Sequence, residues 1–103
     1  QGRMDANVLF HDDQCFVIRD INPLAPTNML VIPHQHLTSL THIDMDQKSL
    51  IGHLFAVAEE IAGNEQVTVS GFRLVINQGP DAGQSIPHLH VHLLGGKPLP
   101  VLG

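Results

Sequence analysis

The sequence predicts a single-domain α+β fold, with an antiparallel sheet of about five strands and one main helix. Short runs rich in β-branched and aromatic residues alternate with turn-forming residues, as strands and their connections do. One central segment instead carries apolar residues at helical spacing. A length of 103 residues suits one domain with a modest core.

The first third of the chain is expected to form three strands. Asn7–Phe10 and Cys15–Ile18 are apolar runs on either side of an Asp-rich turn, which predicts a hairpin. Asp20–Thr27 contains two prolines and is expected to be a loop. A third strand is expected over Asn28–Ile32, where a proline follows. We interpret the next three residues, 34–36, as a partly exposed strand exit.

The helix is expected over Met45–Ala62. Asp44, with Gln47 three residues later, matches a capping box, and Gly63-Asn64 provides a stop signal. The apolar positions at helical spacing are Leu50, Ile51, Leu54, Phe55, Ala58, Ile61 and Ala62. His53 on this helix is interpreted as solvated or interfacial, not catalytic.

The last third is expected to return with two strands. The first covers Phe72–Asn77, and a turn-rich loop follows it. The second carries His88, His90 and His92 in strict alternation with aliphatic residues, and a Gly-Gly pair ends it. Because alternate side chains of a strand share one face, three imidazoles are expected on one face, each about 6.6 Å from the next.

Composition excludes several classes of function. Ten acidic and five basic residues give a net charge of −5, which argues against binding nucleic acid by phosphate neutralisation. No stretch approaches the roughly 18 apolar residues of a membrane span, so no membrane partner is expected and a cytoplasmic location is the default. Cys15 is the only cysteine, which excludes an intramolecular disulfide and, on this reasoning, a zinc–cysteine site. Gln1–Arg3 precede Met4 and fit a cloning remnant, so that residues 4–103 are expected to form the domain.

The three alternating histidines allow three interpretations. As a metal site, His88 and His90 could share one zinc ion, but His92 would lie about 13 Å from the first along an extended strand. If the segment were an ordinary core strand whose histidines have no function, each buried imidazole would need a hydrogen-bond partner. As a nucleophilic site, a neutral imidazole would attack an electrophile to form a covalent intermediate, and neighbouring histidines would disfavour double protonation. The backbone of Gly83-Gln84-Ser85 and the Ser85 hydroxyl could hold a phosphoryl group. We favour this third interpretation, which indicates phosphoryl or nucleotidyl transfer.

The run His88-Leu89-His90-Val91-His92-Leu93-Leu94 resembles the signature of the histidine-triad (HIT) family. The likeness continues in order along most of the chain, from about Phe10 to Gly96. The other matching segments are Asp20–Pro23, Ala25–Thr27, Leu30–Pro33, His36, Asn77, Gly79, Ala82–Ser85 and Gly95–Gly96. Within the family the chain is most similar to the purine nucleoside phosphoramidase (Hint) branch, because of its Gly-Gln-Ser approach and Gly-Gly exit.

The resemblance implies a HIT-like fold and a nucleotide hydrolase or transferase. Its substrates would be purine nucleoside phosphoramidates, whose P–N bond is cleaved through a covalent nucleotidyl-histidine intermediate. His90 would be the nucleophile, the carbonyl of His88 would fix its tautomer, and His92 and Ser85 would assist at the phosphate and leaving group. The residues that would bind substrate are Asp20 at the ribose, Ile18 and Ile21 beside the purine, and Asn77, Gly83, Gln84, Ser85, His90 and His92 around the phosphate and sugar.

The resemblance also implies a homodimer with one sheet continuous across the interface and no metal or other cofactor. The Met45–Ala62 helix is expected to form part of that contact. Asn28 stands where the branch commonly has a fourth histidine, so the network that supports His88 is expected to differ. Two alternative functions stay open at this point: a dinucleoside polyphosphate hydrolase, and a nucleotide-binding regulator with weak activity.

Overall fold

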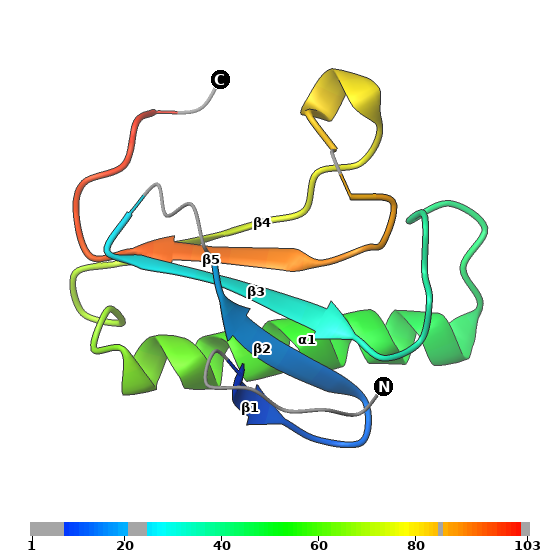
Figure 1. Ribbon diagram of the computed structural model, residues 1–103, viewed down its shortest axis with the longest axis horizontal. Helices are drawn as coiled ribbons and strands as arrows, with labels where there is room; N and C mark the ends of the chain where they lie inside the picture. The colour runs from blue at the N-terminus through cyan, green and yellow to red at the C-terminus, as the bar shows by residue number, and fades with distance from the viewer. Residues whose placement is uncertain (1–7, 21–24, 85, 102–103) are drawn as a thin grey trace.

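The computed structural model describes residues 8–20, 25–84 and 86–101. These residues form a five-stranded antiparallel sheet with one long α-helix across one of its faces (Figure 1). The elements are β1 (Val8–His11), β2 (Cys15–Arg19), β3 (Thr27–Pro33), α1 (Met45–Asn64), β4 (Phe72–Val75), the short 3-10 helix η1 (Pro80–Ala82) and β5 (Val91–Gly95). The strands lie in the order β1-β2-β3-β5-β4, and the predicted α+β class is confirmed. In the part of the chain described, no helix is both long and apolar enough to cross a membrane.

The core lies between the sheet and α1. Alternate residues of the inner strands point to the helix and are fully buried, as the strand pleat requires. These residues are Cys15, Val17, Met29, Val31, Val91 and Leu93. Burial of such side chains stabilises the fold by about 1.5–3 kcal/mol each. The residues between them, including Ile18, Leu30 and His92, point to the opposite, open face and line a pocket there.

The helix begins as predicted and ends later than predicted. The Gln47 amide N–H donates to Asp44 Oδ1 at 2.8 Å, and the Asp44 N–H donates to Gln47 Oε1 at 2.9 Å, so the capping box is confirmed. The helix continues through Asn64, and the left-handed turn comes only at Gln66, with φ of 62°. Of the apolar positions at helical spacing, Phe55 is not part of the core, because the residue is 36% exposed, and Val57 is buried there instead.

The fifth strand differs most from prediction. It starts at Val91, so His92 is the only triad member inside a strand. Pairing between β3 and β5 ends at Val31 and Val91. Pro33 has no amide N–H to continue the ladder, and its carbonyl accepts a hydrogen bond from the His88 imidazole at 3.0 Å. The predicted arrangement of three imidazoles on one strand face is therefore wrong.

Two glycines allow the chain to enter and leave this region. Gly83 has φ of +83° at the end of η1, in the left-handed conformation that favours glycine. Gly96, just after β5, has φ of +91°, and a Cβ on it would lie 3.0 Å from Pro26 Cβ. A side chain at Gly96 would therefore be both strained and crowded.

Candidate active site

A pocket of about 500 Å³ opens on the face of the sheet opposite α1. This volume lies within the range of small-molecule sites. Its walls come from β2, β3, β5 and the loop after β4. The lining residues are Ile18, Arg19, Asp20, Leu30, Asn77, Gly83, Gln84, Ile86, His90 and His92. The pocket thus brings together most of the predicted site residues that the structure describes.

His90 is held in one tautomer by the main-chain carbonyl of His88. Its Nδ1 lies 2.7 Å from the carbonyl oxygen of His88. A carbonyl only accepts, so Nδ1 carries the proton, and in the neutral ring the lone pair is on Nε2. The hydrogen bond that the resemblance implied is present, and it leaves His90 with one nitrogen suited to attack an electrophile.

His88 does not line the pocket, and its ring is instead hydrogen-bonded to Pro33 and His36. Its Nε2–H donates to the Pro33 carbonyl at 3.0 Å, so in the neutral ring Nδ1 is the acceptor. His36 Nδ1 lies 3.1 Å from that atom and acts as donor, with the two rings edge to face at 4.8 Å. His88 thus makes two separate kinds of contact, one through its ring with His36 and Pro33 and one through its main-chain carbonyl with His90.

His36 was expected to belong to a plain strand exit. It is exposed, as expected, yet it is also the partner of His88. Periodicity gives no signal for this contact, because the residues are 52 positions apart. The place of His36 in the family motif is the only feature of the sequence that could have indicated it.

His92 faces the pocket from β5, beside His90. The ring centroids are 4.8 Å apart, closer than the strand repeat predicted, because His90 precedes the strand. Burial lowers the pKa of the His92 imidazole, the charge of His90 lowers it further, and the Asp20 carboxylate opposes both. His92 is therefore neutral near pH 7 and keeps one N–H to donate.

The far end of the pocket pairs a carboxylate with apolar side chains. Ile18 and Leu30 are neighbours on adjacent strands and form an apolar floor. Asp20 comes just after β2, where its backbone N–H donates to the Asn28 carbonyl at 2.9 Å. This bond fixes Asp20 next to the apolar floor, where an aromatic group with an attached diol would find both kinds of contact.

The loop after β4 closes the pocket and is braced by Gln84. The Gly79 N–H donates to Gln84 Oε1 at 2.8 Å, and Gln84 Nε2 donates to the Ile86 carbonyl at 3.2 Å. The Gln84 side chain is thus engaged within the loop, and so is its backbone N–H, which donates to the Gly79 carbonyl at 3.2 Å. Asn77, at the start of the loop, also lines the pocket.

Two predicted site residues, Ile21 and Ser85, lie outside the described residues. Asn28 is buried, at 2% exposure, and among the described residues its Oδ1 has no hydrogen-bond partner. Asn28 makes no hydrogen bond to His88 among the described residues. The His88 ring is instead hydrogen-bonded to His36.

Comparison with known proteins agrees with this architecture. A model of the HIT domain family matches residues 1–99. The chain is 44% identical over 94 residues to an uncharacterized HIT-like protein of Synechococcus elongatus, an alignment that covers 91% of this chain and 82% of that protein.

Solved structures show the same fold. A histidine triad protein from Clostridium difficile is similar with a TM-score of 0.90 and 35% identity, covering 99% of this chain and 89% of that one. A HIT family hydrolase from Legionella pneumophila has a TM-score of 0.87 and 36% identity, covering 92% of this chain and 85% of that one.

Proposed function

The chain belongs to the HIT family, and from that premise we propose that it hydrolyses the P–N bond of purine nucleoside phosphoramidates through a nucleotidyl-histidine intermediate. The similarity to a protein described as a HIT family hydrolase supports a hydrolytic reaction. The observation that carries the proposal is the 2.7 Å hydrogen bond from His90 Nδ1 to the His88 carbonyl. It supports a nucleophile whose lone pair is already on the reacting nitrogen, in a pocket sized for a small molecule.

In the first step, His90 Nε2 bonds to the α-phosphorus while the P–N bond breaks and the leaving nitrogen takes up a proton from solvent. The ring then bears a positive charge, and its Nδ1–H bond to the His88 carbonyl becomes charge-assisted and stronger. Neutral His92, 4.8 Å away between ring centroids, would donate to a phosphoryl oxygen. Ser85, which the resemblance places near the leaving group, would assist. Water then attacks phosphorus, which releases the nucleoside monophosphate and restores neutral His90.

Substrate binding follows from the chemistry of the lining residues. The Asp20 carboxylate would accept hydrogen bonds from the ribose hydroxyls, and Ile18 with Leu30 would contact the face of the purine. Asn77 would donate to and accept from phosphate and sugar oxygens. The backbone N–H groups of Gly83 and Gln84 donate to the Pro80 and Gly79 carbonyls, so they do not serve a phosphate in this conformation.

The decisive experiment measures turnover of an adenosine phosphoramidate by the wild type and by His90→Ala, with His11→Ala as an exposed histidine control outside the pocket. We expect His90→Ala to lose at least about 10³-fold in kcat, as loss of a nucleophile does elsewhere, and His11→Ala to lose none. Wild-type turnover by His90→Ala would refute the proposal.

Two further measurements separate the rival functions. Mass spectrometry after a quenched substrate pulse should find the nucleotide on His90, and a complete lack of adduct together with tight nucleotide binding would indicate a regulator. A kcat/KM that strongly favours dinucleoside polyphosphates over phosphoramidates would instead indicate the polyphosphate hydrolase.

The same proposal includes a homodimer. β4 forms one edge of the sheet that the structure describes, so its outer backbone groups lack a strand partner there. Pairing of two β4 strands would continue the sheet, and α1 would contribute exposed side chains such as Phe55. Light scattering should give a dimer mass that falls to the monomer value in Phe55→Glu but not in Glu59→Gln; a monomeric wild type would contradict the pairing.

A cytoplasmic location completes the proposal. Cys15 is a buried free thiol, which suits a reducing compartment. Recovery of the native protein mainly outside the cytoplasmic fraction would contradict it.

A further inference from the structure

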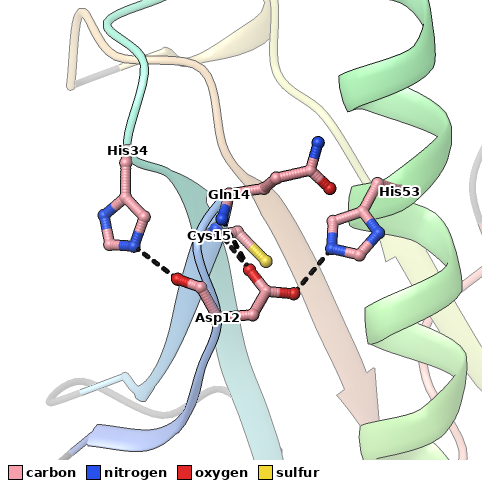
Figure 2. Close-up of polar contacts among 5 residues, drawn as sticks. All are labelled: Asp12, Gln14, Cys15, His34 and His53. Carbon is pink, nitrogen blue, oxygen red and sulfur yellow. Dashed lines mark hydrogen bonds and ion pairs between the residues drawn. The ribbon is translucent and has the colours of Figure 1, made fainter.

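A second cluster of reactive side chains lies on the helix-covered side of the sheet, and none of its members lines the pocket. Asp12 comes from the turn between β1 and β2, Cys15 is the first residue of β2, and His53 is on α1 (Figure 2). One possible ligand atom from each of the three lies within 4.8 Å of the other two. The fold thus brings a carboxylate, a thiol and an imidazole to one point from separate elements.

The carboxylate is fixed from its own turn. Asp12 Oδ1 accepts the backbone N–H groups of Gln14 and Cys15, both at 2.8 Å. The Asp12 carbonyl also accepts from His34 Nε2 at 3.0 Å (Figure 2). Oδ2 is therefore directed at His53 Nε2, 2.7 Å away. The two bonds to Oδ1 are the kind that orient a metal ligand, whereas the His34 bond is to the main chain and not to the carboxylate.

The donor set is one that zinc prefers. Zinc in proteins is bound by thiolate, imidazole and carboxylate, with bonds of about 2.0–2.3 Å. Ligand atoms of one tetrahedral ion then lie about 3.3–3.6 Å apart, so shifts of roughly 1 Å bring all three into place. Burial and the nearby Asp12 carboxylate raise the pKa of the Cys15 thiol to about 12, so without a cation the thiol keeps its proton. A divalent ion would have to displace that proton, and its charge would then offset the thiolate and the carboxylate together.

We propose that Asp12, Cys15 and His53 bind one Zn²⁺ ion, with water as the fourth ligand, and that the ion ties the β1–β2 turn to α1. On binding, the thiol releases its proton to solvent, and the His53 ring proton moves to Nδ1, so that Nε2 bonds to the ion. The side chains of His53 and Asp12 are 32% and 26% exposed, which leaves a path for the ion and room for the water. The single cysteine predicted that a zinc–cysteine site is excluded, and the proposed site departs from that expectation. A site with one thiolate depends instead on contacts between residues far apart in the chain, which the sequence does not show.

The test uses the whole chain and cobalt(II) as a spectroscopic substitute for zinc. A thiolate bound to cobalt gives a charge-transfer band in the near ultraviolet. Because Cys15 is the only cysteine, such a band in the wild type can come from no other residue. We expect one equivalent of cobalt to give the band and one equivalent of zinc to abolish it. Absence of the band in the wild type would overturn the proposal, even if His88, His90 or His92 binds cobalt.

Variants then assign the other two ligands. His53→Gln and Asp12→Asn should each weaken cobalt binding at least tenfold, and Asp12→Asn keeps an oxygen for the two turn N–H groups. His34→Gln, which changes a neighbour of Asp12 outside the ligand set, is the matched control and should bind as the wild type does. His36→Gln removes the close contact between the His36 and His88 rings and should keep the band. Wild-type affinity in both His53→Gln and Asp12→Asn would overturn the assignment, as would loss of the band in His36→Gln.

Stability gives a readout that needs no spectroscopic band. Zinc should raise the Tm of the wild type and of His34→Gln but not that of His53→Gln, since a ligand stabilises only the state that binds it. Equal rises in all three proteins would place the ion elsewhere and overturn the proposal.

Discussion

The hydrogen bond from His36 to the His88 ring predicts a measurable role for a residue outside the pocket, because the main-chain carbonyl of the same His88 holds His90. His36→Phe keeps a ring of similar size in the edge-to-face contact at 4.8 Å but removes the N–H that His88 Nδ1 accepts at 3.1 Å. The contact is exposed, so the loss should correspond to one ordinary hydrogen bond, about 0.5–1.5 kcal/mol. That free energy equals a decrease in kcat of roughly 2- to 12-fold.

The assay is steady-state turnover of an adenosine phosphoramidate. We expect kcat to fall and KM to stay within about twofold, because His36 supports the orientation of His88 and does not line the pocket. ¹⁵N NMR should still find the proton of neutral His88 on Nε2 in His36→Phe, because the Pro33 carbonyl continues to accept it, so a lower kcat would report lost orientation of the ring and not a changed tautomer. His34→Phe makes the same change at an exposed neighbouring histidine and should leave kcat unchanged. Unchanged kcat in His36→Phe would refute coupling along these bonds, and a loss above about 100-fold would mean that His36 acts on the substrate directly.

Three further outcomes follow from individual contacts. NMR titration of the free protein should give His92 a pKa below the ordinary value of about 6.5, and Asp20→Asn should lower it further because that carboxylate favours the protonated ring; a rise in Asp20→Asn would contradict this. Gly96→Ala should lower the free energy of unfolding by at least about 1 kcal/mol, since φ is +91° and the new Cβ would meet Pro26 Cβ at 3.0 Å; an unchanged denaturation midpoint would show that the turn adapts. Asp44→Ala should cost about 1 kcal/mol in chemical unfolding through loss of the capping box, whereas Asp44→Asn should cost little, and equal losses in both would refute the capping explanation.

The features of the fold that could be predicted are those encoded by neighbours in the sequence. The capping box depends on residues three apart, so Asp44 and Gln47 identified the start of α1. The apolar run Cys15–Ile18 indicated β2, but all four residues are apolar, so the run did not indicate which face of the strand is buried. The inward face of α1 was only partly predicted, because the choice between Phe55 and Val57 depends on where the sheet lies beneath the helix.

The features of the site that could not be predicted depend on distant pairs. The strand alternation of His88, His90 and His92 was real in sequence, but the ladder that would extend it stops at the β3 proline. The His36–His88 pair and the Asp12–His53 pair join segments 52 and 41 positions apart, and no local pattern encodes either. The triad motif therefore identified the reactive residues without giving their geometry.

Pro33 determines where the regular sheet stops and the candidate chemistry starts. Residue 33 has no amide proton to donate, and the Leu89 N–H donates to the Leu37 carbonyl, so the Pro33 carbonyl accepts from the His88 ring instead. His88 and His90 then lie outside the regular strand, where the His90 ring bonds to the His88 carbonyl. A designer who transplanted the His-x-His-x-His run into another sheet would obtain three evenly spaced imidazoles and no oriented nucleophile. A transplanted site would thus need the His-x-His-x-His segment together with a residue on the adjacent strand that ends the hydrogen-bond ladder, as Pro33 does here.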